Sequence, residues 1–280
     1  MTKKRIATLI VLLLSLHHST QASLLTLTTW NMEWLSIEPN TRSQQDLRKI
    51  TQYFAQLDTD ILAFQEVNSI QAIKTIVGNE YKIYLSDRHR QKSYFNINQY
   101  TGFAVKKGIT VTDKTDFSLS SKHHLRFASY LILNQEKHKP IHLLSIHLKA
   151  GCRSIKSHSQ SCKVLKKEFD SIHQWIASRV SAQDLFIILG DFNYPLTESN
   201  SFLLSKQIKS ETILATKKIK QTCMVKSKKK QQLFRYPTII DHILVSKGIT
   251  ITSAEMHNFN PQDVLHFNLT DHCPISVKIN

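Results

Sequence analysis

The stretch DLFIILGDFNYP, Asp184–Pro195, decides how the rest of the chain is interpreted. Five apolar residues, 185–189, run into a glycine, and Asp191 and Asn193 follow at once. A short run of this kind is typical of a strand that is buried on both faces. Gly, Asp, Asn and Pro also end strands for conformational reasons alone, so turn chemistry is one explanation of the acid and the amide. A functional site at the end of the strand is the other explanation.

Strand-like and helix-like segments alternate along the whole chain. Apolar residues repeated every three to four positions predict helices at 42–57, 70–77 and, most clearly, 164–180. Apolar or alternating runs predict strands at 25–31, 61–64, 81–86, 102–106, 127–133, 141–148, 185–189, 239–246 and 274–279. Residues 206–230 lack periodicity and are predicted to form loop with short helices. Because no Pro/Gly/Ser-rich linker divides the chain, we expect one α/β or α+β domain.

Six of these strands carry polar side chains at or near an end. The residues are Asn31 with Glu33, Glu66, His147, Asp191 with Asn193, Asp241 with His242, and Asp271 with His272. In α/β sheets, sites are built at strand ends. Carboxylates suit a hard divalent cation, histidines suit protons or phosphate charge, and amides orient water or an oxyanion. The sequence contains no Gly-x-Ser-x-Gly, P-loop or Gly-x-Gly-x-x-Gly signature that would indicate another chemistry.

Taken singly, several of these residues also have a structural explanation. Asn31 and Asp271 suit turns, and His147 suits a core position in which its hydrogen bonds are satisfied. His242 follows Asp241 on a strand and therefore points to the opposite face, so we interpret it as structural.

The N-terminus has the features of a signal peptide. Residues 3–5 are basic, residues 6–16 are mainly apolar, and Thr20–Ala22 offers small residues for cleavage. The apolar run is too short to span a bilayer. We therefore expect residues 1–22 to be removed and residues 23–280 to form one exported domain without stable membrane insertion. An N-terminal membrane anchor is the alternative.

Export to the periplasm or the extracellular space would allow disulfides among Cys152, Cys162, Cys223 and Cys273. Four cysteines permit three pairings, and the sequence alone does not choose among them. A bond between Cys152 and Cys162 would close a short loop and leave Cys223 for Cys273. A zinc site is the rival interpretation, but no Cys-x-x-Cys or histidine spacing supports it.

Basic residues dominate the surface charge. The formal net charge is +16, and loss of residues 1–22 would leave 34 basic against 21 acidic residues, or +13. Residues 206–230 hold nine lysines and one acid, and a second basic stretch covers 149–167. Such a field favours nucleic acid, an anionic membrane or a polyphosphate. A lysine-rich surface that faces only water is the alternative.

Six short motifs resemble those of one known family, in the family's order and over nearly all of residues 23–280. They are TTWNMEWL (28–35), AFQEV (63–67), LLSIHLKAGC (143–152), ILGDFN (188–193), IIDHILVS (239–246) and LTDHCPISV (269–277). The chain resembles the endonuclease/exonuclease/phosphatase superfamily, which includes deoxyribonuclease I and neutral sphingomyelinases. The resemblance implies an α+β four-layer sandwich of two packed mixed β-sheets with helices on both outer faces.

The resemblance also implies metal-dependent cleavage of a phosphoester. Glu66 would be the chief ligand of Mg²⁺, with Asn31 beside it and Asp271 as a second metal or water ligand. Participation of Ca²⁺ or Mn²⁺ stays open. Mg²⁺ usually takes only one or two protein carboxylates and keeps its waters, so this set is sufficient.

The remaining motif residues would act on water and phosphate. Asp191 would position or activate the attacking water, and Asn193 would orient the phosphate. His272 would contact the scissile phosphate, with Asp241 as its carboxylate partner. His147 matches a second histidine of the deoxyribonuclease I branch. The sequence leaves open which residue is the formal base.

Within the family, the basic charge and His147 favour a secreted, rather non-specific nuclease that acts on DNA as a monomer, with RNA as a further possible substrate. Arg126, Tyr100 and Lys149 are candidate contacts to the substrate phosphate or sugar. The alternatives are a phospholipid or sphingomyelin phosphodiesterase, a phosphoinositide phosphatase, and a non-enzymatic binding protein. A lipid enzyme usually needs an exposed apolar loop. No Trp/Phe-rich loop is apparent, because all three tryptophans are expected in the core: Trp30, Trp34 and Trp175.

Overall fold

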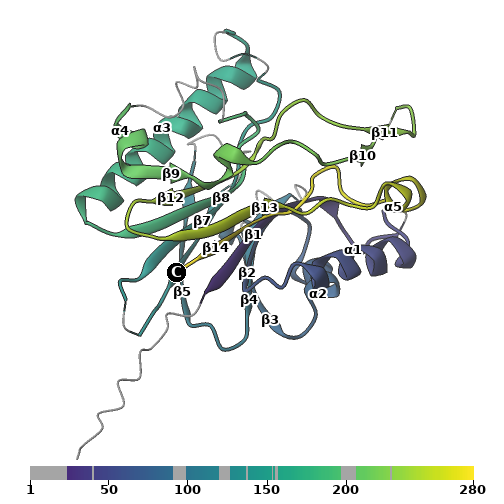
Figure 1. Cartoon of the computed structure of the whole chain (residues 1–280), viewed down its shortest axis with the longest axis horizontal. Coiled ribbons are helices and arrows are strands. Elements are labelled where there is room, and N and C mark those ends of the chain that lie inside the picture. The colour runs from purple at the N-terminus through teal and green to yellow at the C-terminus, as the bar shows by residue number, and fades with distance from the viewer. Residues whose placement is uncertain are drawn as a thin grey trace, which may run out of the picture.

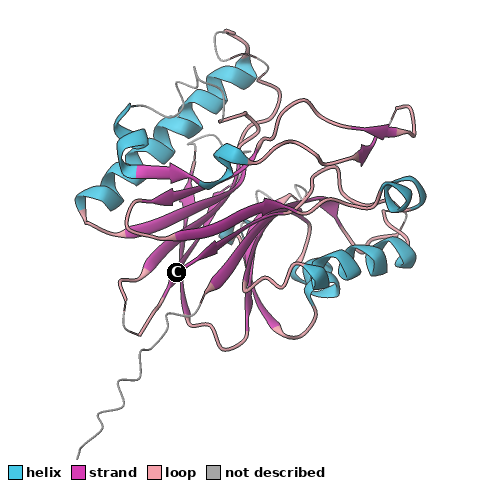
Figure 2. Cartoon of the chain, viewed as in Figure 1, coloured by secondary structure: helices cyan, strands magenta, loops and turns pink. Residues whose placement is uncertain are grey.

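The computed structural model describes residues 24–39, 41–90, 99–119, 127–136, 138–152, 154, 157–196, 206–227 and 229–280. The predicted signal peptide lies outside the described residues. Two six-stranded mixed sheets form the centre of the molecule, and helices flank them (Figure 1, Figure 2). This arrangement confirms the α+β sandwich that the motifs implied.

The first sheet has the strand order β13-β14-β1-β2-β4-β3. Its strands are β1 (Leu25–Leu35), β2 (Ile61–Val67), β3 (Tyr81–Leu85), β4 (Tyr100–Lys106), β13 (Ile251–Met256) and β14 (Ile275–Ile279). The second sheet has the order β5-β6-β7-β8-β12-β9. Its strands are β5 (Val111–Ser118), β6 (Phe127–Leu133), β7 (Ile141–His147), β8 (Leu185–Asp191), β9 (Thr212–Leu214) and β12 (Asp241–Ser246). A separate hairpin pairs β10 (Val225–Lys226) with β11 (Leu233–Phe234).

Helices cover both outer faces of the sandwich. Helices α1 (Gln44–Gln56) and α2 (Ile70–Val77) pack on the first sheet, and α3 (Gln160–Ser181) packs on the second. The short helices α4 (Lys206–Glu211) and α5 (Pro261–His266) lie in the connections, as do the 3-10 turns η1 (Asp87–Arg90) and η3 (Ala215–Lys218). Among the described residues, no helix combines the length and the hydropathy that a membrane crossing requires.

The central strands are apolar throughout because each of their faces meets a different core. In β8, Phe186 and Ile188 face the helix α3, whereas Ile187 and Leu189 face the first sheet. This two-residue alternation between two buried faces explains the continuous apolar run at residues 185–189.

Most predicted elements are confirmed, and the differences have local causes. Helix α3 begins at Gln160 rather than at residue 164, because the Ser159 side chain accepts a hydrogen bond from the Cys162 amide and caps it. Strands β5 and β13 were not predicted. Both are largely exposed edge strands rich in polar residues, so they lack the apolar signal. Residues 206–230 are loop and short helices as predicted, with the added short strands β9 and β10.

The prediction that Trp30 and Trp34 both pack in the core is half wrong. Trp30 is 1% exposed, and its indole nitrogen donates to the Thr270 hydroxyl. Trp34 is 55% exposed, because the backbone at Glu33 and Trp34 leaves the extended conformation, with φ of 45° and 53°. The alternation of the strand therefore does not extend to Trp34.

Two disulfides are present, Cys152–Cys162 and Cys223–Cys273. The first joins the segment after β7 to the first turn of α3, and the second joins the segment before β10 to the residue after His272. Disulfides of this kind are typical of oxidising compartments.

His242 is fully buried and its contacts are structural, as its position on β12 predicted. Its Nε2 accepts from the Leu196 amide at 3.0 Å, and its Nδ1 lies 2.8 Å from the Thr216 hydroxyl. An Nε2 that accepts leaves the ring proton on Nδ1, so the ring is neutral.

We expect His242 to make the fold sensitive to acid. Burial lowers its pKa to about 3, whereas the unfolded chain has an ordinary value near ~6.5. The unfolded state therefore binds the additional proton, and stability is lost as the pH falls below the ordinary value. The loss should approach about 2 kcal/mol at pH 5. Urea unfolding at pH 7 and pH 5 should show a smaller loss for His242→Gln than for the wild type. His266→Gln, on an exposed histidine of α5, should lose as much stability between pH 7 and pH 5 as the wild type does. An equal loss of stability in the wild type and in both variants would contradict the role assigned to His242.

Candidate functional site

The polar residues at the strand ends of the second sheet lie side by side. Parallel pairing of β7 with β8 places His147 opposite Asp191, and antiparallel pairing of β8 with β12 places Asp241 opposite Asp191 on the other side. Asp191 is therefore the middle one of three titratable residues on neighbouring strands. The order of the strands, more than any local motif, brings these residues together.

Gly190 allows β7 and β8 to approach each other beside Asp191. A Cβ atom at Gly190 would lie 2.0 Å from the carbonyl oxygen of Ile146 on β7, and the φ of Gly190 is +150°. No side chain fits at that distance. Both the close approach of Ile146 and the positive φ therefore require glycine at this position. The glycine in the opening stretch therefore serves the placement of Asp191 next to His147.

The buried Asp191 carboxylate is the hub of the site. Its Oδ2 accepts from Asn31 Nδ2 at 3.1 Å, and its Oδ1 accepts from the Asn193 amide at 2.7 Å. Asn31 belongs to β1 of the first sheet, so this hydrogen bond links the two sheets. His147 Nε2 and His272 Nε2 lie 3.5 Å and 3.8 Å from Oδ2.

His272 is held in one orientation by Asp241. Its Nδ1 donates to Asp241 Oδ2 at 2.6 Å, which leaves Nε2 directed towards Asp191. The backbone carbonyl of His272 accepts from the Trp30 indole at 3.1 Å and from the Thr270 hydroxyl at 2.6 Å. The residue is thus fixed through both its ring and its main chain.

Burial and neighbouring charges shift the pKa values of both Asp191 and His272. Burial raises the pKa of Asp191 to about 7, although the neighbouring His272 acts in the opposite direction. Burial by itself would lower the pKa of His272, but the carboxylates of Asp241 and Asp191 outweigh it and hold that pKa well above the ordinary value. Near neutral pH the site therefore contains a protonated imidazole beside a carboxylate that can take up a proton.

Glu66 reaches the same place from the first sheet through an unusual backbone. The pairing of β2 shifts register with both β1 and β4 near Glu66, which indicates β-bulges. The φ of Glu66 is +57°, a conformation that is costly for any residue with a Cβ and is characteristic of functional positions. Glu66 Oε1 lies 3.6 Å from His147 Nε2, and Oε2 accepts from the Trp34 amide at 3.2 Å.

The donor set fits a hard divalent metal ion. Glu66 Oε1 and Asp191 Oδ2 lie 3.6 Å and 3.5 Å from His147 Nε2, so the imidazole stands between the two carboxylate oxygens that the site offers. Such oxygens are the ligands that Mg²⁺ prefers. Asp191, Asp241 and His272 also offer ligand atoms within 4.8 Å of one another. We regard that second group as the poorer metal site, because His272 and Asp241 already satisfy each other.

The other predicted residues are placed as follows. Asp271 Oδ1 lies 3.8 Å from His272 Nε2, and Asn193 donates from Nδ2 to the carbonyl of Leu148 at 3.0 Å. Lys149 follows His147 by two residues, and its amide donates to the buried Glu168 carboxylate at 2.7 Å. Tyr100 is 5% exposed and packs against His89 and Arg88, so it offers little surface to a substrate. Arg126 lies outside the described residues.

Sequence reasoning missed an aromatic surface that adjoins the site. Phe234 and Tyr236 are 43% and 46% exposed and line a cavity of about 180 Å³ together with Lys226, Ser227 and Asp271. A cavity of about 300 Å³ continues from Lys226 and Asp271 to Glu33. The available signal was the aromatic pair Phe234 and Tyr236 at the end of a lysine-rich stretch, which motif comparison does not detect.

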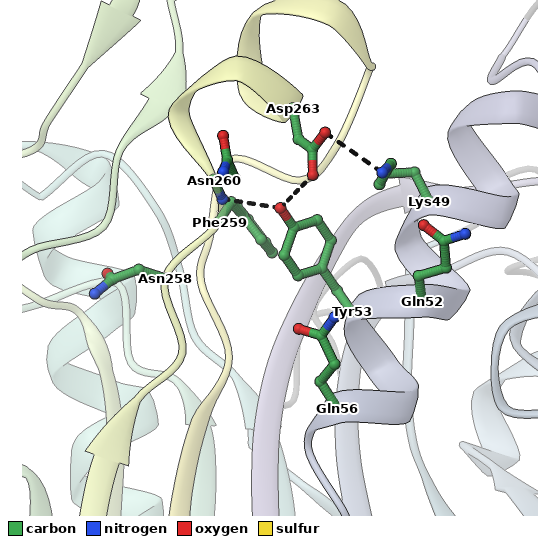
Figure 3. A pocket seen from close by; sticks show the side chains of 8 residues that line it. All are labelled: Lys49, Gln52, Tyr53, Gln56, Asn258, Phe259, Asn260 and Asp263. Carbon is green, nitrogen blue, oxygen red and sulfur yellow. Dashed lines mark hydrogen bonds and ion pairs between the residues drawn. The ribbon is translucent and has the colours of Figure 1, made fainter.

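A separate cavity of about 430 Å³ lies between α1 and the segment before α5 (Figure 3). Tyr53 donates to Asp263 Oδ2 at 2.7 Å and accepts from the Asn260 amide at 2.8 Å, and Lys49 lies 3.4 Å from Asp263 Oδ1. These contacts connect α1 to α5 (Figure 3). Asp263, the one acid that lines this cavity, is thereby engaged in contacts within the fold. We therefore assign the cavity a structural role.

Comparison with known proteins agrees with this geometry. Residues 28–272 match the profile of the Endonuclease/Exonuclease/phosphatase family. No curated protein matches the sequence significantly. A Bacteroides vulgatus structure described as an endonuclease/exonuclease/phosphatase has a TM-score of 0.68 and 15% identity, over 92% of this chain and 99% of that chain.

Two further solved structures share the fold. TDP2 from Caenorhabditis elegans has a TM-score of 0.68 and 17% identity, over 91% of this chain and 75% of that chain. The Bacteroides thetaiotaomicron mannosyl-6-phosphatase has a TM-score of 0.64 and 15% identity, over 91% of this chain and 99% of that chain. At these identities the likeness shows the fold alone.

Proposed function

The chain belongs to the Endonuclease/Exonuclease/phosphatase family, and from that premise we propose that it is a metal-dependent endonuclease that hydrolyses phosphodiester bonds of DNA. The observation that carries the proposal is the hydrogen-bonded pair of His272 and Asp241, 2.6 Å apart, which directs His272 Nε2 towards Asp191. A charged imidazole and a proton-accepting carboxylate side by side match the needs of phosphoester hydrolysis. One group faces the phosphate, and the other faces the water.

The proposed roles follow from the contacts of each residue. Asp191, with a pKa raised to about 7 by burial, accepts the proton of the attacking water near neutral pH. His272 donates hydrogen bonds to the scissile phosphate from Nε2, while Asp241 fixes the ring. The Asn193 amide donates to Asp191 Oδ1 and Asn31 donates to Oδ2, and Oδ2 is the oxygen that lies near His147 and His272. His147 lies between Asp191 and Glu66, with its Nε2 directed at both carboxylates.

Glu66 would hold the metal ion, with Asn31 and Asp271 assisting from either side. Bound Mg²⁺ would supply positive charge that neutralises the phosphate oxygens in the transition state. Ca²⁺ or Mn²⁺ would satisfy the same oxygen ligands.

DNA as the substrate rests on charge and on the shape of the surface beside the site. The residues between Glu211 and Asp241 include Lys226, Lys229, Lys230 and Arg235, and no acid stands among them. Basic residues beside a phosphoester site neutralise the phosphates on either side of the cut. RNA offers the same backbone charge, so DNA is the first substrate to test and RNA the second.

We further propose that the protein acts as a monomer in the periplasm or outside the cell. Both disulfides lie close to a site histidine, one after β7 and one next to His272. In an oxidising compartment these disulfides would persist and would hold the two segments in place.

The test is nicking of supercoiled plasmid by the protein without residues 1–22. We expect nicking with Mg²⁺ and none after removal of the metal by EDTA. His272→Ala should lower the rate about 1,000-fold, because it removes a proton-bearing contact to the phosphate. His266→Ala, on an exposed histidine of α5, should nick at the wild-type rate.

A folded wild type that does not nick plasmid or cut linear DNA or RNA would contradict the proposal. The same preparation should then be tested on sphingomyelin, phosphoinositides and a sugar monophosphate. If one of these is hydrolysed, and His272→Ala lowers that rate by the same factor, the assigned site would be correct and the proposed substrate would be wrong.

A further inference from the structure

The hairpin of β10 and β11 is fastened beside the proposed catalytic residues. The Cys223–Cys273 disulfide joins the segment that enters β10 to the residue after His272. Figure 1 shows the hairpin projecting on the same side of the molecule as α5. Asp271 contributes to the cavity below the hairpin and lies 3.8 Å from His272 Nε2. A ligand in this cavity would therefore be next to the phosphate that His272 contacts.

Two aromatic rings form the wall of this cavity. Phe234 and Tyr236 are in edge-to-face contact, with ring centroids 4.9 Å apart and an interplanar angle of 90°. Each side chain is nearly half exposed, so ring surface remains open to a ligand. Most large apolar side chains of the described residues are buried, which sets this pair apart.

The charged side chains of the hairpin that carries the rings are all positive, and Asp271 is the one acid that lines the cavity. Lys226 lines the cavity with them, and the exposed Lys229, Lys230 and Arg235 belong to the same hairpin. Aromatic rings with cations around them suit a ligand that combines a flat π-system with phosphate charge.

The position of the apolar surface argues for a nucleobase rather than a membrane. The described residues at the turn of the hairpin, Ser227 and 229–232, are polar or charged. The rings are in β11 and just after it, on the side that faces Asp271. A loop that enters a lipid interface would carry its apolar side chains at the tip.

We propose that Phe234 and Tyr236 form a stacking subsite for an unpaired nucleobase of single-stranded nucleic acid, with Lys226 on the adjoining phosphate. The proposal rests on the proposed nuclease function and names its preferred substrate. Bases in a duplex are stacked on one another and do not offer a face to the rings. The enzyme therefore binds single strands, frayed ends or melted segments of supercoiled DNA more tightly than relaxed duplex.

Binding tests the subsite independently of hydrolysis. Fluorescence anisotropy of a labelled oligothymidine in EDTA should show about tenfold weaker binding by the double variant Phe234→Ala/Tyr236→Ala than by the wild type. The exchange variant Phe234→Tyr/Tyr236→Phe keeps both rings and should bind as the wild type does. Ile213→Ala, an exposed apolar residue on β9, is the matched control and should change nothing. An oligonucleotide of abasic sugar phosphates should bind the wild type and the double variant equally.

The outcomes separate this proposal from the nuclease proposal. Unchanged oligothymidine binding in the double variant would overturn the proposed subsite. An equal loss of affinity for oligothymidine and for duplex DNA would overturn it as well. Loss of binding to phosphatidylserine vesicles with unchanged oligothymidine binding would also overturn it and indicate a lipid surface. If the wild type cuts no nucleic acid but oligothymidine binding falls in the double variant, the nuclease proposal fails and the subsite stands. Thermal unfolding of each variant verifies that it is folded.

Discussion

Asp191→Asn is expected to reduce nicking about 1,000-fold or more while leaving the folded protein intact. Asparagine has the shape of aspartate, and its side-chain oxygen can still accept from the Asn193 amide, although Asn31 loses its acceptor at the other oxygen. It cannot accept a proton from water, so the variant lacks the base that we propose. The loss should appear in kcat and less in KM, because Asp191 acts on the water rather than on substrate binding.

The same substitution should change how stability depends on pH. Burial raises the pKa of Asp191 to about 7, against ~3.9 in an unfolded chain. The folded state therefore binds the additional proton, and the metal-free wild type loses stability as the pH rises between these two values. Relative to the wild type, metal-free Asp191→Asn should gain about 2 kcal/mol between pH 5 and pH 8.

Denaturant unfolding in EDTA at pH 5 and pH 8 measures this change, and plasmid nicking measures the rate. Asp184→Asn is a suitable control, because Asp184 precedes the same strand at its other end and pairs with Arg179 at 3.0 Å. That variant should nick like the wild type. Full activity in Asp191→Asn would exclude Asp191 as the base, and an unchanged pH dependence would show that its proton is not bound in the folded state.

The sequence predicted the polar residues of the site better than it predicted their surroundings. Asp191, Asp241 and His272 each stand beside an apolar run of the length and composition of a strand. The sequence does not contain the strand order β7-β8-β12, which brings Asp191 between His147 and Asp241. Only the resemblance to a family indicated that these residues would meet.

Two features could not be predicted because neither leaves a signal in the apolar pattern. The exposure of Trp34 follows from left-handed backbone at Glu33 and Trp34, in a strand whose pattern indicates continued alternation. The position of Phe234 and Tyr236 depends on the disulfide between Cys223 and Cys273, which are far apart in sequence. Apolar periodicity describes only what a segment buries, so surface loops that are fixed by distant bonds leave no periodic signal.

Glu66→Gln is expected to weaken the binding of the metal ion strongly. Glutamine keeps one neutral oxygen and loses the charge that Mg²⁺ requires, while the Trp34 amide can still donate to that oxygen. Nicking at limiting Mg²⁺ should fall about 100-fold or more, and part of it should return at high Mg²⁺, because affinity rather than the reaction is impaired. Stability should not fall much, because the left-handed backbone at Glu66 costs glutamine as much as glutamate.

Thermal unfolding measures metal binding without any reaction. A metal ion at about 100 times its Kd should stabilise the wild type by about 2.7 kcal/mol, and Glu66→Gln should lose most of that gain. Glu255→Gln, on the exposed strand β13, removes one carboxylate away from the site and should keep the full gain.

If Glu66→Gln responds to Mg²⁺ like the wild type, the ion is bound elsewhere. The group of Asp191, Asp241 and His272 then becomes the site to test, because its ligand atoms lie within 4.8 Å of one another. In that case Asp241 would have to give up its bond to His272, and Asp241→Asn would lose the metal response that Glu66→Gln had kept.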